Sequence, residues 1–120
     1  MFEIKIKRAY EAADETDGIR ILIDRLWPRG ISKDKLQIVS WEKDLAPSAD
    51  LRKWFDHDPE KFDEFSRKYR QELEENERSD EFLAECRKWL ENQNLTFVYA
   101  AKDEEHNNAL VLREWVKAQI

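Results

Sequence analysis

Two clusters of polar side chains in this sequence each follow an apolar run, and together they could do chemistry. The first cluster is Asp24, Arg25 and Arg29, after the run Ile19–Ile23. The second is Lys102, His106 and Asn107, after the run Leu95–Ala101. Arg and Lys side chains bind phosphate and carboxylate groups, and a carboxyl or imidazole group can move a proton. The two clusters could therefore bind an anion and act on it.

The two clusters can meet only if the apolar runs are parallel strands of one sheet. Both runs are rich in β-branched and aromatic residues, which is typical of strands buried on both faces. Ligands of α/β proteins lie beyond the carboxyl ends of such strands. Asp103 is the predicted N-cap of a final helix, whose first turn would direct free N–H groups to the same edge. The sequence thus predicts an anion pocket with Asp24 at its floor.

Each candidate residue also has a purely structural interpretation. Asp24 could form an ion pair with Arg25 or Arg29 that holds the turn, because buried charges are usually paired. His106, predicted near the third position of the final helix, could be an acid or base, or an ordinary surface histidine. His57 could reach the pocket if the Trp54–Phe55 segment folds over it as a lid. Alternatively, His57 lies beside the cap of the following helix.

The sequence as a whole predicts a single α/β domain spanning residues 1–120. A small, mostly parallel three-stranded sheet is expected from Phe2–Lys7, Ile19–Leu26 and Leu95–Ala101, covered by amphipathic helices. The connection between the first two strands is short for a helical crossover, so the first strand could also pair antiparallel. Asp58 and Pro59 mark the start of a helix. Its apolar stripe is Phe62, Phe65, Tyr69 and Leu73.

Composition restricts the possible partners and the compartment. The 120 residues carry a net charge of −6, which disfavours nucleic acid and anionic membrane surfaces as partners. Neither a membrane span nor a secretory signal is predicted. The single cysteine, Cys86, lies on a predicted apolar helix face, which favours a core residue over a nucleophile, and it fits a cytoplasmic protein. No metal site is expected because the ligand spacing is wrong, and no cofactor motif is present.

Three long motifs resemble those of the YeaO-like bacterial proteins, a family without an assigned activity. They are Arg20–Lys33, the segment from Leu45 to Pro59, and Tyr99–Asn107. The resemblance spans nearly the whole chain and implies a small cytosolic α/β protein. A broader set of relatives has a longer helical crossover after the first strand, which favours the parallel orientation here.

Two functions of different classes are compatible with these observations. One is a small enzyme acting on an anionic metabolite or nucleotide-like substrate, with Arg25, Arg29 and Lys102 binding charge and Asp24 or His106 moving a proton. The other is a non-catalytic binding or regulatory module that uses the same pocket or the Trp54–Phe55 segment. The sequence does not distinguish them, and it leaves the oligomeric state open.

Overall fold

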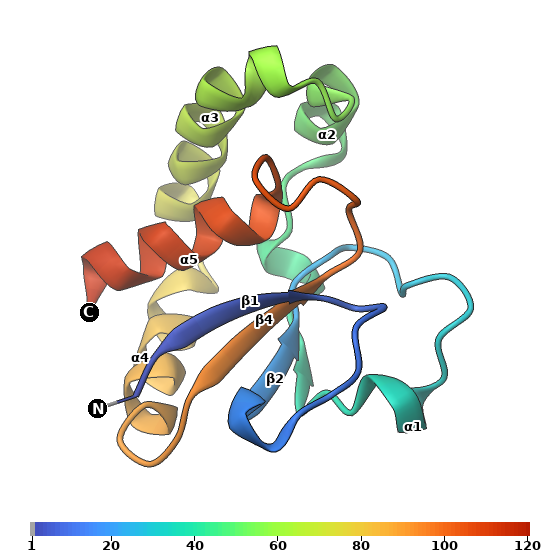
Figure 1. Cartoon of the computed structure of the whole chain (residues 1–120). Helices are drawn as coiled ribbons and strands as arrows, with labels where there is room; N and C mark the ends of the chain where they lie inside the picture. Colours follow the sequence, from blue (N-terminus) through green and yellow to red (C-terminus); the bar gives the residue numbers. More distant parts are fainter. Residues whose placement is uncertain (1) are drawn as a thin grey trace.

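A parallel sheet of four strands runs through the molecule, and the computed structural model describes residues 2–120 of it. The strands are β1 (Ile4–Arg8), β2 (Ile19–Leu22), β3 (Ser40–Trp41) and β4 (Leu95–Tyr99). Their order across the sheet is β1-β4-β2-β3, with every neighbouring pair parallel. The predicted α/β class and the parallel orientation of the first strand are therefore confirmed. The last strand in the sequence, β4, lies between β1 and β2, so the two strands predicted to flank the site, β2 and β4, are neighbours (Figure 1).

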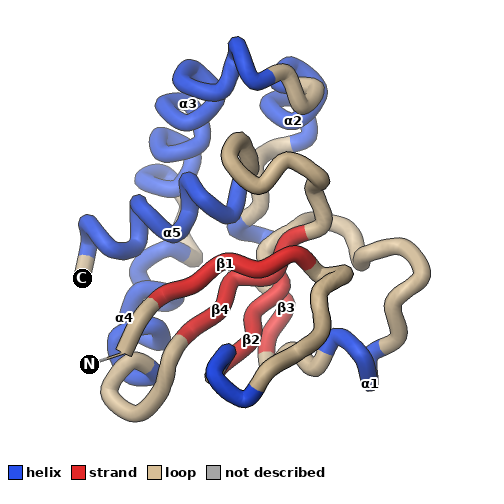
Figure 2. Tube along the Cα trace, viewed as in Figure 1, coloured by secondary structure: helices blue, strands red, loops and turns tan. Residues whose placement is uncertain are grey.

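The helices divide unequally between the two faces of the sheet. Figure 2 shows the long helices gathered to one side of the strands, with α1 on the other side. The helices are α1 (Lys33–Leu36), α2 (Ala49–Phe55), α3 (Phe62–Glu75), α4 (Ser79–Trp89) and α5 (Asn108–Gln119). Short 3₁₀ turns cover Glu15–Asp17, Lys43–Leu45 and Pro59–Lys61. Within the described chain, no helix combines the length and apolar character required to cross a bilayer.

Side chains alternate between the two faces of each strand, so the sheet has two cores. Ile21 and Phe97 belong to the large core, into which α3, α4 and α5 direct their apolar stripes. Leu22 and Val98 point the other way, into a small cluster with Leu36. Phe65, Tyr69 and Leu73 are buried in the large core and Phe62 packs at its border, which confirms the predicted stripe of α3.

The sheet differs from the expected one in strand number and in the ends of its strands. The sequence predicts three strands, and the fourth, β3, is too short to leave an alternating pattern. The strand expected to reach Leu26 ends at Leu22, because the backbone N–H of Ile23 makes the last bond to Val98 and the chain then turns. This turn directs Asp24 away from the ladder and towards the loop after β4.

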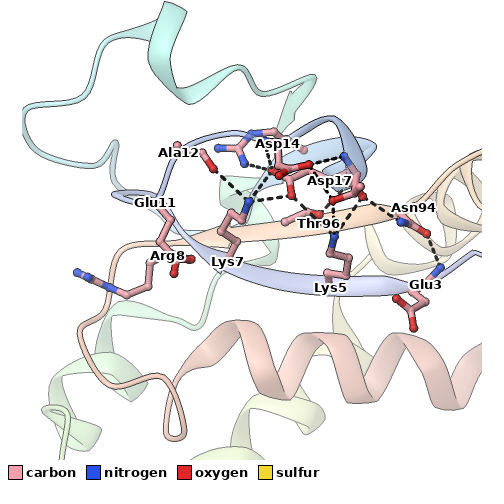
Figure 3. Close-up of polar contacts among 12 residues, drawn as sticks. Glu3, Lys5, Lys7, Arg8, Glu11, Ala12, Asp14, Asp17, Asn94 and Thr96 are labelled. Atoms are coloured by element: carbon pink, nitrogen blue, oxygen red, sulfur yellow. Dashed lines mark hydrogen bonds and ion pairs between the residues drawn. The ribbon is translucent and has the colours of Figure 1, made fainter.

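On the face opposite the long helices, cations surround the buried carboxylate of Asp17. Lys7 Nζ lies 2.9 Å from Oδ1, and Arg20 Nη1 lies 2.6 Å from Oδ2. Figure 3 shows the Lys7 contact together with those of Lys5 and Thr96. Burial raises the pKa of Asp17, but hydrogen bonds from Lys7, the Asp14 backbone and Arg20 outweigh it and hold that pKa below its usual value. We call this set the Asp17 network.

Candidate functional site

A cavity of about 730 Å³ opens at the carboxyl ends of β2 and β4, and we call it the strand-end cavity. All seven residues predicted for the site line it: Asp24, Arg25, Arg29, His57, Lys102, His106 and Asn107. They come from three separate segments, namely the turn after β2, the turn after α2 and the loop between β4 and α5. The parallel sheet therefore brings the two predicted clusters to one place.

Asp24 is fixed by hydrogen bonds from two uncharged donors. The backbone N–H of Ala100 donates to its Oδ2 at 2.9 Å, and Asn108 Nδ2 donates to its Oδ1 at 2.9 Å. The indole N–H of Trp41 donates to its backbone carbonyl at 2.7 Å. Asp24 thereby ties the turn after β2 to the end of β4 and to the first residue of α5.

The charge of Asp24 is only partly compensated. Burial raises the pKa of its carboxyl, and the hydrogen bonds from Asn108 and Ala100 and the nearby charges of Arg52 and His57 oppose this rise without cancelling it. Among residues 2–120, Asp24 makes no ion pair, so the structural interpretation as a pair with Arg25 or Arg29 is wrong. Asp24 is therefore a carboxyl group of raised proton affinity at the cavity.

Four permanent cations line the cavity, against two carboxylates. The cations are Arg25, Arg29, Arg52 and Lys102, and the carboxylates are Asp24 and Asp103. In the described part of the chain, none of these four cations forms an ion pair; Arg52 Nε donates to the Pro47 carbonyl at 3.2 Å. The cavity is thus locally basic on a chain whose net charge is −6. The sequence predicts three of these four cations, Arg25, Arg29 and Lys102, for the site.

His106 and Asp103 form a pair at the rim of the cavity. The ring Nδ1 of His106 lies 2.9 Å from Asp103 Oδ2, and Phe62 contacts the ring edge-on at 5.3 Å between centroids. The backbone N–H groups of Glu105 and His106 donate to Asp103 Oδ1, and these bonds lower the pKa of Asp103, the Glu105 bond most. Asp103 therefore caps its own turn. The prediction that it caps the final helix is wrong, and His106 precedes that helix.

Asn107 is the true N-cap of α5. Its side-chain oxygen accepts from the Leu110 N–H at 2.8 Å, and its Nδ2 donates to the Asp103 carbonyl at 2.9 Å. The side chain is buried, and both of its polar atoms are engaged within the loop. Asn107 thus lines the cavity as predicted, but its geometry is that of a residue that shapes the loop.

The segment expected to form a lid divides between core and surface. Phe55 is buried and stacks on Phe65 with 4.2 Å between ring centroids. Trp54 is 37% exposed and lies under Lys68, outside the cavity lining. The prediction of a shared Trp54–Phe55 surface is wrong because the two rings point in different directions. His57 follows in a left-handed turn (φ 55°) and lines the cavity.

Among the lining residues that the sequence did not predict are Tyr10, Arg52 and Asn108, which have polar side chains. Asn108 had a detectable signal, since the pair Asn107–Asn108 stands where a helix begins and Asn is favoured there. Arg52 lies on the short helix α2 beside the buried Leu51, and nothing in the neighbouring sequence indicates that its side chain reaches the cavity. Tyr10 reaches across to the backbone carbonyl of Arg29, to which its hydroxyl donates at 3.0 Å.

Metal-ligating and thiol groups are not organised into a site. Among residues 2–120, no group of three or more His, Cys, Asp or Glu side chains is arranged to hold a metal ion. Cys86 is buried in the large core, and burial raises the pKa of its thiol to about 12. This position agrees with its interpretation as a core residue.

Comparison with known proteins gives one consistent family. A family model described as "Inactive DUF488-N3 subclade" matches residues 3–120. The chain is 42% identical over 115 residues to the uncharacterized protein YeaO of Escherichia coli K12, covering 96% of this chain and 97% of YeaO. It is 41% identical over 111 residues to the uncharacterized protein Rv3073c of Mycobacterium tuberculosis H37Rv, covering 92% and 91%. No solved structure gives a significant match. The chain therefore belongs to the YeaO-like family, within the DUF488-N3 subclade that is described as inactive.

Proposed function

We propose that the strand-end cavity binds a small anionic molecule and that the protein acts as a non-catalytic binding module in the cytoplasm. The observation that carries this proposal is the set of four cations around one cavity, none of them paired within residues 2–120. Like charges repel when they converge, so an anion between them would lower the electrostatic energy. Arg and Lys side chains are the usual partners of phosphate and carboxylate groups.

The size and walls of the cavity indicate more than a bare ion. A volume of about 730 Å³ is in the range of sites that enclose whole metabolites. Trp27, Phe55 and Phe65 supply apolar and aromatic surface beside the cations. A ligand with an anionic group and a planar or apolar part, such as a nucleotide-like metabolite, would use both kinds of surface.

A second candidate is an enzyme that moves a proton on the same ligand. It is favoured by the raised pKa of Asp24 and by the His106–Asp103 pair, because acid–base catalysis uses such groups. The subclade description "inactive" favours the binding module instead. A ligand found by screening separates the two: an enzyme would convert it, and His106→Gln would stop the conversion, whereas a binding module would return it unchanged.

The binding proposal is tested by anion-dependent melting. Sulfate and pyrophosphate should raise the melting temperature of the wild type, because a ligand that binds only the folded state stabilises it. Arg29→Gln, Arg52→Gln and Lys102→Gln should each weaken the apparent affinity by about tenfold to 150-fold, the loss expected for one charge-assisted hydrogen bond.

Lys88→Gln is the matched control, because Lys88 is exposed on α4 and does not line the cavity. It should respond to both anions as the wild type does. Equal responses from all variants, or no response from the wild type, would contradict anion binding at this cavity.

A further inference from the structure

We propose that Asp24 takes up a proton from solvent when the anion binds, and that its carboxyl O–H then donates to the anion. This inference rests on the proposed function of the strand-end cavity. A carboxylate is an unfavourable neighbour for an anion, and yet Asp24 is fixed in a cavity lined by four cations. Protonation removes this conflict, because a neutral carboxylic acid is a hydrogen-bond donor.

The hydrogen bonds of Asp24 suit both of its protonation states. Each oxygen accepts one bond, from the Ala100 backbone or from Asn108, and neither donor is charged. An oxygen that carries a proton can still accept one bond while donating another. Both anchors therefore persist when Asp24 becomes neutral, and the new O–H is free to donate into the cavity.

The charged and titratable groups around Asp24 come from every neighbouring segment. Its own turn contributes Arg25 and Arg29, and the loop after β4 contributes Lys102, Asp103 and His106. Arg52 and His57 act from α2 and the turn after it, and the neutral Tyr69 faces Asp24 from α3. The cations favour the ionised form while the site is empty. A bound anion would offset their effect, so the proton affinity of Asp24 should rise on binding.

Proton uptake has a definite thermodynamic sign. One proton moves from solvent to Asp24 for each anion bound, so the anion affinity should rise as the pH falls. The limiting slope is about tenfold in Kd per pH unit for a single linked proton. The alternative is that Asp24 stays ionised and accepts a hydrogen bond from a donor on the ligand. In that case an anion without a donor would bind without proton uptake by Asp24.

The experiment measures sulfate binding by titration calorimetry between pH 5 and pH 8. Sulfate is used because it stays fully ionised and carries no donor there. His57→Gln/His106→Gln is the background, so that proton uptake by these two imidazole rings does not contribute. Titrations in two buffers of different ionisation enthalpy count the protons taken up.

In this background, sulfate should bind more weakly as the pH rises, and the change in Kd should approach about tenfold per pH unit. The titrations should also show that protons are taken up when sulfate binds. Adding Asp24→Asn should give tighter binding at pH 7 and remove the pH dependence, because the amide is a permanent neutral donor. Proton uptake that persists unchanged in this variant, or weaker binding by it, would overturn the inference.

A second measurement needs no substitution. The carbon-13 resonance of the Asp24 carboxyl in the wild type should titrate at higher pH with sulfate than without it. An unchanged or lower titration midpoint would also overturn the inference. Failure of the binding proposal looks different: no sulfate would bind at any pH, to the wild type or to the Asp24→Asn variant.

Discussion

Asp17 precedes β2 in the sequence and Asp24 follows it, and the two carboxylates have opposite surroundings: one is paired with cations and the other is not. Asp17 is fully buried and contacts Lys7 (Figure 3) and Arg20 directly. Within residues 2–120, the carboxylate of Asp24 accepts hydrogen bonds only from the Ala100 backbone and the Asn108 amide, although four cations line the same cavity. The pKa of Asp17 is lowered by its partners in spite of burial, whereas burial raises the pKa of Asp24.

The difference separates charges that hold the fold from charges that are available for a ligand. In the Asp17 network, both carboxylate oxygens contact a cation, and the geometry leaves little room for anything else. At the strand-end cavity the cations and Asp24 remain apart, and space lies between them. Two charged clusters of similar composition can therefore differ in role: the Asp17 network stabilises the fold, and the strand-end cavity is available for a ligand. Three sets of substitutions test this difference.

Asp17→Asn should have the largest effect. The variant removes the charge that faces Arg20, a side chain that is 3% exposed and whose Nη2 already lacks a partner in the described structure. Breaking a buried ion pair in this way should lower the free energy of unfolding by about 3–5 kcal/mol. Urea denaturation measures the change, with the exposed Glu91→Gln as the control. A loss no greater than that of the control would mean that the Asp17 network is not structural.

Lys7→Gln and Lys102→Gln form a matched pair of intermediate effect. Lys7 donates to both oxygens of Asp17, so its loss should cost about 1–3 kcal/mol of unfolding free energy. Lys102 is exposed at the cavity, and its loss should change stability by no more than about 0.5 kcal/mol. Denaturation of both variants in the same buffer gives the comparison. A larger loss for Lys102→Gln would reverse the assignment of the two clusters.

The smallest effect is expected for Asp24→Asn, and its sign depends on pH. The folded pKa of Asp24 is raised, so its ionisation opposes folding, and the wild type loses stability as the pH rises from about 3.9 through that folded pKa. Asp24→Asn lacks this loss, so the stability of the variant relative to the wild type should rise with pH. Below the unfolded pKa a constant difference should remain, because the amide NH2 group of Asn cannot accept the hydrogen bond from Ala100 or Asn108.

Ionisation of Asp17 affects stability in the opposite direction to ionisation of Asp24, so Asp17 serves as an internal reference. Its stabilisation is present above the unfolded pKa and is lost as the pH falls through the lowered folded pKa. Urea denaturation of both proteins between pH 4 and pH 7 gives the difference curve for Asp24. A variant that loses stability relative to the wild type as the pH rises would contradict the pKa direction assigned to Asp24.

Much of the sheet could be predicted because its strands have strong local patterns. The runs around Ile21 and Phe97 are continuous and apolar, and a parallel sheet places their carboxyl ends together, which located the cavity. The two-residue β3 carries too little pattern to be recognised. The start of α5 was misplaced because both Asp103 and Asn107 are good caps, and only the bonds to Glu105 and His106 show that Asp103 closes an earlier turn.

The partners within the site depend on tertiary packing and could not be read from spacing. Nothing in the sequence shows that Asn108, and not Arg25 or Arg29, contacts Asp24. Arg52 reaches the cavity because α2 packs beside α3, which is a long-range contact. Likewise, the two rings of Trp54 and Phe55 were assigned to one surface because a short helix does not reveal which of its sides is covered.

The central place of β4 has a consequence for how the protein is made. β1 and β2 do not touch each other in the sheet, because each pairs with β4. During synthesis the residues before Leu95 therefore emerge without the strand that joins β1 to β2, and β2 can pair only with the two-residue β3. The growing chain can complete its main core only after Leu95–Tyr99 and α5 have left the ribosome, because both contribute to that core. Until then its apolar strands depend on transient contacts, or on chaperones, to stay out of aggregates.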